Sequence, residues 1–180
     1  MSTHDSVISA PIRLRALEPD DADLLYVADN DCDVWPGSES VAPYSQHMLR
    51  EYALNYDADP FSAGQIRLVA TIAEGRHESS PIGLLDLYEI SPLHAHAWVG
   101  IYVRPEMRRR GYALEMLRLA AVYASSTLRI NRLGARVLDS NEASMKLFSR
   151  AGYRHCGMLP QWHFSRGGFE DMHIFCIDLH

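Results

Sequence analysis

The sequence lacks the features that mark membrane-spanning, secreted and zinc-binding proteins. No apolar run among its 180 residues approaches the roughly 20 residues that cross a bilayer. The N-terminal residues do not follow the basic, apolar and small-residue pattern of a signal peptide. The cysteines are few, far apart and without zinc spacing: Cys32, Cys156 and Cys176. We therefore expect a cytoplasmic protein with reduced thiols, no membrane partner and no metal site.

Two phosphate-binding motifs are missing as well. The chain contains neither the Gly-x-Gly-x-x-Gly of dinucleotide-binding folds nor the Gly-x-x-x-x-Gly-Lys-Ser/Thr of P-loop enzymes. Histidines are numerous, but His94 and His96 have no carboxylate or thiol partner at ligand spacing. These absences argue against a dinucleotide fold and exclude a P-loop enzyme.

What the chain does contain is the composition of an ordinary globular protein. Hydrophobic residues make up 47% of it and charged residues 22%, a balance far from that of disordered proteins. Its length suits one domain that can bury a proper core. We expect residues 1–180 to form a single domain, with residues 1–10 as a flexible N-terminal tail.

The formal net charge of −6 conceals a strong asymmetry along the chain. Residues 18–59 contain eleven acidic residues and one basic residue, a net charge of −10. Residues 104–154 contain eleven basic and four acidic residues, a net charge of +7. The first region should attract cations and the second anions, unless both are only solvated faces. A nucleic-acid binder would more often be basic overall, so the acidic total argues against a nucleic-acid partner.

Periodicity and turn residues predict the order of helices and strands. Strands are predicted over residues 12–17, 66–73, 82–90, 95–103, 133–137, 161–166 and 169–179. Helices are predicted over residues 19–28, 44–56 and 111–128, and after a cap at Asp139 or Asn141 as far as Gly152. Residues 74–80 are predicted as a polar hairpin connection and Gly167-Gly168 as a tight turn. We expect an α/β (α+β) fold whose mixed, mostly antiparallel sheet has about six to seven strands and about four flanking helices.

The most informative stretch covers residues 99–113, where a strand, a short basic loop and a helix follow one another. Three consecutive arginines, Arg108, Arg109 and Arg110, precede the helix that Gly111 opens. Cations are disfavoured at a helix N-terminus, because its exposed backbone N–H groups already carry positive partial charge. The arrangement becomes favourable when an anion binds to the loop. The stretch therefore predicts a cradle for a phosphate or pyrophosphate.

Two signatures in this order resemble the GCN5-related N-acetyltransferase (GNAT) superfamily. The first is Arg108-x-x-Gly111-x-Ala113 on the strand–loop–helix unit. The second is Asn141-x-x-Ser144, followed by Gly152-Tyr153. The resemblance covers residues 12–179 and implies a GNAT-type acetyltransferase domain. In this family the loop wraps the pyrophosphate of acetyl-CoA and the preceding strand pairs with the pantetheine arm.

The resemblance therefore implies acetyl-CoA as the cofactor, with CoA as the product. It also implies a set of cofactor-binding residues on the strand, on the loop and on the later helix. These are Ile101, Tyr102, Val103, Arg108, Arg109, Arg110, Gly111, Tyr112, Ala113, Asn141, Ser144 and Phe148.

Within the superfamily, two branches resemble this chain in residues 82–90, in residues 141–148 and in the closing glycine hairpin. One branch acetylates spermidine and spermine, and the other acetylates protein N-termini, including those of ribosomal proteins. The Asp29-Asn30-Asp31 loop with Val34-Trp35, together with the acidic N-terminal part, favours a polyamine-like amine. A protein N-terminus stays an alternative acceptor. The family often forms dimers or larger assemblies, so a homo-oligomer stays open.

The resemblance also implies direct transfer to a primary amine, with a backbone N–H near Gly100 polarising the thioester carbonyl. The polyamine branch has a tyrosine acid where this chain has Phe148, and often a glutamate where it has Trp98. Neither substitute can transfer a proton in the same way. The cysteines lie outside the motifs, which argues against a covalent cysteine intermediate.

Other residues must then supply the proton chemistry. In the ribosomal-protein branch the signature serine can serve the thiolate, and Ser144 holds that position. The candidate bases are His163, just before the final hairpin turn, and then His96. The rival interpretation is a non-catalytic regulatory module of the same fold that binds an acyl-CoA.

Overall fold

A computed structural model describes residues 11–31, 42–74, 77–165 and 167–179. The expected tail over residues 1–10, Cys32 and the Val34-Trp35 part of the acidic loop lie outside these ranges. The elements, in chain order, are β1 (Ile12–Ala16), η1 (Pro19–Asp21), α1 (Ala22–Asp29), α2 (Gln46–Leu54), β2 (Ile66–Glu74), β3 (His77–Ser91), β4 (His96–Val103), η3 (Pro105–Met107), α3 (Tyr112–Ser126), β5 (Arg132–Leu138), α4 (Glu142–Arg150), β6 (Arg154–Ser165) and β7 (Gly168–Asp178).

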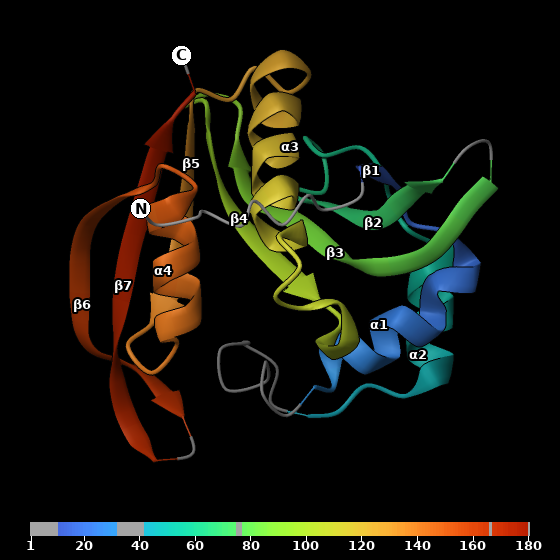
Figure 1. Ribbon diagram of the computed structural model, residues 1–180, viewed down its shortest axis with the longest axis horizontal. Coiled ribbons are helices and arrows are strands. Elements are labelled where there is room, and N and C mark those ends of the chain that lie inside the picture. The colour runs from blue at the N-terminus through green and yellow to red at the C-terminus, as the bar shows by residue number, and fades with distance from the viewer. Residues whose placement is uncertain (1–10, 32–41, 75–76, 166, 180) are drawn as a thin grey trace, which may run out of the picture.

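One twisted sheet connects all of the described strands (Figure 1). Its seven strands lie in the order β1-β2-β3-β4-β5-β7-β6. Strands β4 and β5 are parallel and are joined through α3, and every other neighbouring pair is antiparallel. The predicted mixed, mostly antiparallel sheet with four α-helices is therefore confirmed.

The helices cover the sheet in two layers, because successive strand residues point to opposite faces. Helices α3 and α4 lie on one face (Figure 1) and pack on residues such as Leu85 and Val99. Helices α1 and α2 lie on the other face, where Leu84 and Tyr102 are buried. That second face therefore has a helical cover over β2–β4.

The ends of the elements agree with the sequence signals in most places. Asn141 is the N-cap of α4, since its side chain accepts the Ser144 N–H at 3.0 Å. Asp139, the other predicted cap, does not fill this role. Gly152 follows the end of α4 with a φ of +88°, the left-handed conformation that glycine adopts at little cost. Among the described residues, no helix is long and apolar enough to cross a membrane.

Three predicted boundaries are wrong. The strand predicted from residue 161 already begins at Arg154, as β6. The predicted connection over residues 74–80 is mostly strand, because β2 continues to Glu74 and β3 begins at His77. The last hairpin turn also lies one residue earlier than predicted, since Gly168 already pairs with Ser165 as the start of β7.

Candidate functional site

Strands β4 and β5 separate along their length. They pair only at His96–Arg132, Ala97–Leu133 and Trp98–Gly134, although β4 continues to Val103 and β5 to Leu138. On its other side β4 stays paired with β3 as far as Val103. Beyond Trp98, the backbone groups on the β5 side of β4 therefore have no partner strand among the described strands. Such groups can bind the amide groups of an extended ligand.

The loop between β4 and α3 presents backbone N–H groups at the wide end of this separation. Arg109 and Gly111 both have left-handed backbone, with φ values of 63° and 84°. In the part of the chain that the structure describes, no side-chain hydrogen bond caps the N-terminus of α3 at Gly111. The first N–H groups of an α-helix have no acceptor inside the helix. Those of residues 112–114 are therefore available to an anion, beside the exposed Arg109 and Arg110.

Arg108 holds this loop in place. Its Nε donates to the Val103 carbonyl at 3.0 Å, and its Nη2 lies 3.2 Å from Asp31. Its guanidinium also lies 5.9 Å from the centre of the Tyr102 ring. The side chain thus connects the loop to β4 and to the end of α1, a positioning role that its place in the motif does not reveal.

The second signature lies at the start of α4. Asn141 is exposed and Ser144 is half-buried, so both are accessible near the end of β5. Phe148 is different, because only 5% of it is exposed and it packs against Tyr153 and Phe175 at centroid distances of 5.0 and 6.2 Å. The structure therefore places Phe148 in the hydrophobic core.

The two candidate bases lie far apart. His163 is half-buried on β6 and pairs with Glu170, whose carboxylate accepts the Ser140 N–H at 3.3 Å. That bond joins β7, the strand that pairs with β6, to the loop before α4. His96 stacks on His94 at the first residue of β4. At about 3.3 Å per residue it lies about 13 Å from Gly100, so the structure does not bring it together with the others.

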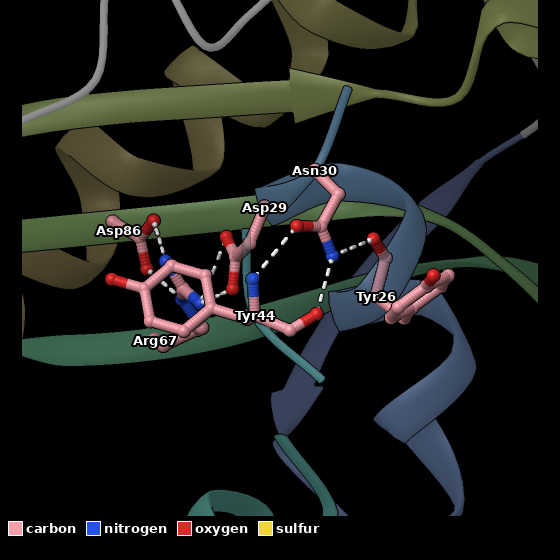
Figure 2. A network of polar contacts seen from close by, with 6 residues as sticks. All are labelled: Tyr26, Asp29, Asn30, Tyr44, Arg67 and Asp86. Carbon is pink, nitrogen blue, oxygen red and sulfur yellow. Dashed lines mark hydrogen bonds and ion pairs between the residues drawn. The ribbon is translucent and has the colours of Figure 1, made fainter. Parts of the chain in front are cut away.

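Acidic side chains lie beside β4 on the face that α1 and α2 cover. Asp86 is the β3 partner of Gly100, and its carboxylate accepts two hydrogen bonds from Arg67 at 2.7 and 3.0 Å. Arg67 also binds Asp29 of α1 at 3.0 Å, so one guanidinium lies between two carboxylates (Figure 2). Burial raises the pKa of Asp29 more than Arg67 lowers it. The cluster has one negative charge in excess when both acids are ionised.

The same cluster is fixed to the helices by neutral contacts. Asn30, at the end of α1, donates to the carbonyls of Tyr26 and Tyr44 at 3.0 Å and accepts the Tyr44 N–H at 2.9 Å (Figure 2). The Tyr56 hydroxyl of the segment after α2 accepts the Arg67 backbone N–H. These contacts fix the end of α1, next to Asp29, and the backbone of Arg67.

A third group that sequence reasoning missed surrounds Trp98. The Arg136 guanidinium lies 4.2 Å from the centre of the Trp98 ring. It donates to both oxygens of Glu89, at 2.7 and 2.8 Å. The Tyr102 hydroxyl, two strand positions beyond Gly100, is also noteworthy. It is buried without a hydrogen-bond partner among the described residues. No local pattern in the sequence indicates either feature.

Comparison with known proteins identifies relatives of this chain. A family model described as an acetyltransferase (GNAT) domain matches residues 12–154. The chain is 26% identical to spermidine N(1)-acetyltransferase of Escherichia coli K12, over 94% of this chain and 87% of that protein. It is also 26% identical to an N-acetyltransferase of Bacillus subtilis, over 91% of both chains.

Solved structures agree with this comparison. A spermidine N-acetyltransferase from Vibrio cholerae, crystallised with CoA and spermine, superposes with a TM-score of 0.80 at 25% identity. The match covers 93% of this chain and 95% of that one. A dodecameric form of the Vibrio cholerae enzyme superposes with a TM-score of 0.75 and the same identity.

Proposed function

Because this chain belongs to the acetyltransferase (GNAT) family and is an N-acetyltransferase, we propose that it acetylates a primary amine of a polyamine. The donor is acetyl-CoA. The observation that carries the choice of acceptor is the position of Asp86, the β3 partner of Gly100 beside the strand separation. A carboxylate cluster with excess negative charge attracts an alkylammonium group. Relatives named spermidine acetyltransferases support the same acceptor class.

The residues present fit acetyl-CoA in two places. The uncapped N-terminus of α3, with the exposed Arg109 and Arg110, suits a pyrophosphate. The unpaired side of residues 101–103 suits the amides of the pantetheine arm. Asn141 and Ser144 lie across the separation at the start of α4. Arg108 contributes by fixing the loop, since its guanidinium already binds Val103 and Asp31.

The acetyl group passes directly from the thioester to the amine, without an acyl group bound covalently to the enzyme. The neutral amine nitrogen attacks the thioester carbon, its N–C bond forms, and the C–S bond then breaks. The backbone N–H groups near Gly100 stabilise the oxyanion that forms between these events. One proton leaves the amine nitrogen and one is taken up by the departing thiolate. His163 stays the proposed base and Ser144 a proposed donor to the thiolate.

Tyr102 is a further proposed proton donor. Positions 100 and 102 of β4 are on the same face of the sheet, and the Tyr102 hydroxyl lacks a partner among the described residues. Burial raises the pKa of Tyr102, so the phenol is protonated at neutral pH. A protonated hydroxyl near the thioester can replace the acid that Phe148 cannot supply.

Exposed aromatic side chains on the β6–β7 hairpin support self-association. Trp162, Phe164 and Phe169 are 64%, 69% and 61% exposed near its tip, and the two phenylalanine rings pack edge to face at 5.2 Å. Large exposed aromatic residues in one place are typical of protein interfaces. We expect a homo-oligomer, which light scattering coupled to size-exclusion chromatography would detect.

Release of free thiol from acetyl-CoA tests the proposal. Spermidine, spermine and a peptide with a free N-terminus are compared as acceptors, and products are identified by mass spectrometry. We expect acetylated polyamine and little acetylated peptide. Asp86→Asn should raise the KM for the polyamine at least about tenfold, whereas Asp23→Asn, an exposed position on α1, should leave it unchanged. Acetylation of the peptide alone would contradict the polyamine assignment, and tight CoA binding without turnover would support the regulatory module.

A further inference from the structure

Arg136 fills a box made of two aromatic rings and a carboxylate. Its guanidinium lies 4.2 Å from the centre of the Trp98 ring and 5.9 Å from that of Tyr88. The same group donates two hydrogen bonds to Glu89, at 2.7 and 2.8 Å. Aromatic faces combined with a carboxylate are how proteins bind organic cations, including ammonium ligands. The chain's own guanidinium therefore occupies a place whose chemistry suits an alkylammonium.

The box lies next to the proposed site of transfer. Trp98 and Gly100 are two residues apart on β4, so their side-chain positions share one face of the sheet. Their β3 partners on that face are Tyr88 and Asp86. Trp98 is also the last residue of β4 that pairs with β5. A ligand that reaches Gly100 from this face therefore has Asp86 on one side and the box beside it.

The frame of the box is rigid. A β-carbon at position 134 would lie 2.7 Å from two atoms of the Trp98 ring, so the indole rests directly on the backbone of β5. Trp98, Tyr88 and Arg136 are all half-buried, whereas Glu89 is exposed. The indole is thus fixed, and the Glu89 carboxylate reaches solvent.

We propose that Arg136 is a specificity residue that blocks a second ammonium site formed by Trp98, Tyr88 and Glu89. This inference rests on the proposed function and deepens it. An acceptor with one ammonium group near Asp86 makes no contact with the box. A longer polyamine cannot place a further ammonium group in the box, because Arg136 fills the space and repels a like charge. The enzyme therefore favours short amines over spermine.

Replacement of Arg136 by methionine should open the box, since methionine keeps an apolar stem of similar length without the charge. We expect Arg136→Met to lower the KM for spermine about tenfold, within the range of cation–π and ion-pair energies. The KM values for a monoamine and for acetyl-CoA should stay within about twofold, and Arg136→Lys, which keeps the charge, should resemble the parent. Arg132→Met is the matched control on the same strand, because Arg132 pairs with Asp178 away from the box.

A second substitution shows whether the box itself causes the gain. In the Arg136→Met background, Trp98→Leu should abolish the decrease in the KM for spermine. Calorimetric binding of spermine to the CoA-loaded protein should follow the same order, with Arg136→Met binding about tenfold tighter than the parent. Equal spermine affinity in the parent and in Arg136→Met, with both folded by thermal unfolding, would overturn the inference. Tighter binding without acetylation of any polyamine would support the box and contradict the proposed function instead.

Discussion

The indole of Trp98 rests on Gly134, its partner in the last rung that joins β4 to β5. A β-carbon on residue 134 would lie 2.7 Å from the ring atoms Cε3 and Cζ3, closer than non-bonded carbon atoms approach. From His96 to Trp98 strand β4 is paired with β5, and beyond Trp98 the two strands separate. The contact therefore marks the point where the proposed acetyl-CoA site begins.

Gly134→Ala should disturb both folding and activity. The added methyl group must displace the indole or shift β5, and overpacking of this kind costs about 1–3 kcal/mol. We expect a lower urea midpoint and a reduced kcat/KM for the amine. Gly157→Ala on β6 is the control, since a β-carbon there meets nothing within 4 Å. Equal effects of the two substitutions would show that the contact is unimportant.

Gly111→Ala should weaken acetyl-CoA binding specifically. Gly111 has a φ of +84° and Gly64 a φ of +67°, and an L-residue in this region costs about 1–2 kcal/mol. Both alanine variants should therefore lose similar stability in chemical denaturation. Only Gly111→Ala alters the N–H loop, so we expect its KM for acetyl-CoA to rise about tenfold. A similar KM increase in Gly64→Ala would contradict the cradle.

Tyr102→Phe should slow the chemical step. If the Tyr102 hydroxyl donates the thiolate proton, its removal should lower kcat about a hundredfold, at the low end of general-acid contributions, with little change in the acetyl-CoA KM. Tyr153 has the other tyrosine hydroxyl that is buried without a partner among the described residues. It packs on Phe148 in the core, so Tyr153→Phe should leave kcat unchanged. An unchanged kcat in Tyr102→Phe would return the role of acid to Ser144.

Asp29 should make stability depend on pH in a defined direction. Burial raises its pKa in the folded protein despite the Arg67 contact. A raised carboxyl pKa favours folding below the unfolded value, and this contribution is lost as the pH rises through the folded value. Asp29→Asn cannot ionise, so it should gain stability relative to the parent between about pH 3 and about pH 7. Urea unfolding of both proteins at the two pH values measures this, and the opposite trend would exclude a raised pKa.

The cysteines should be dispensable for transfer. Burial, and then the neighbouring Cys156 thiol, raise the pKa of Cys176 to about 11, which leaves little reactive thiolate near neutral pH. A variant with serine at Cys32, Cys156 and Cys176 should keep kcat within about twofold, since direct transfer needs no thiol nucleophile. Trapping of an acetylated cysteine in the parent by mass spectrometry would contradict direct transfer.

The cofactor loop could be predicted because its signals are local. Gly111, the arginines before it and the helical spacing after it lie within one short stretch, and the Asn141 cap has an equally local signature. Backbone conformation and helix ends depend mainly on neighbouring residues, so these features can be read from the chain. The mixed, mostly antiparallel sheet also follows from the succession of elements, whereas the strand order, with β7 between β5 and β6, was not predicted.

The acceptor side could not be predicted, because its contacts join distant segments. Arg136 and Glu89 are 47 residues apart, and Arg67 and Asp29 are 38 apart. Which side chains meet across strands depends on pairing register, and a shift of one residue would turn each of them to the other face. The resemblance likewise gives the place of Phe148 on α4 but not the rings that pack against it, Tyr153 and Phe175.

A crystal structure of the protein with CoA bound tests the proposed site most directly. We predict the pyrophosphate within hydrogen-bond distance of the N–H groups of residues 109–113, and the pantetheine arm along residues 101–103. The sulfur should lie between β4 and β5 near Gly100, with Tyr102 or Ser144 close enough to donate a proton. CoA bound elsewhere, with β4 and β5 unoccupied beyond Trp98, would contradict the site described above.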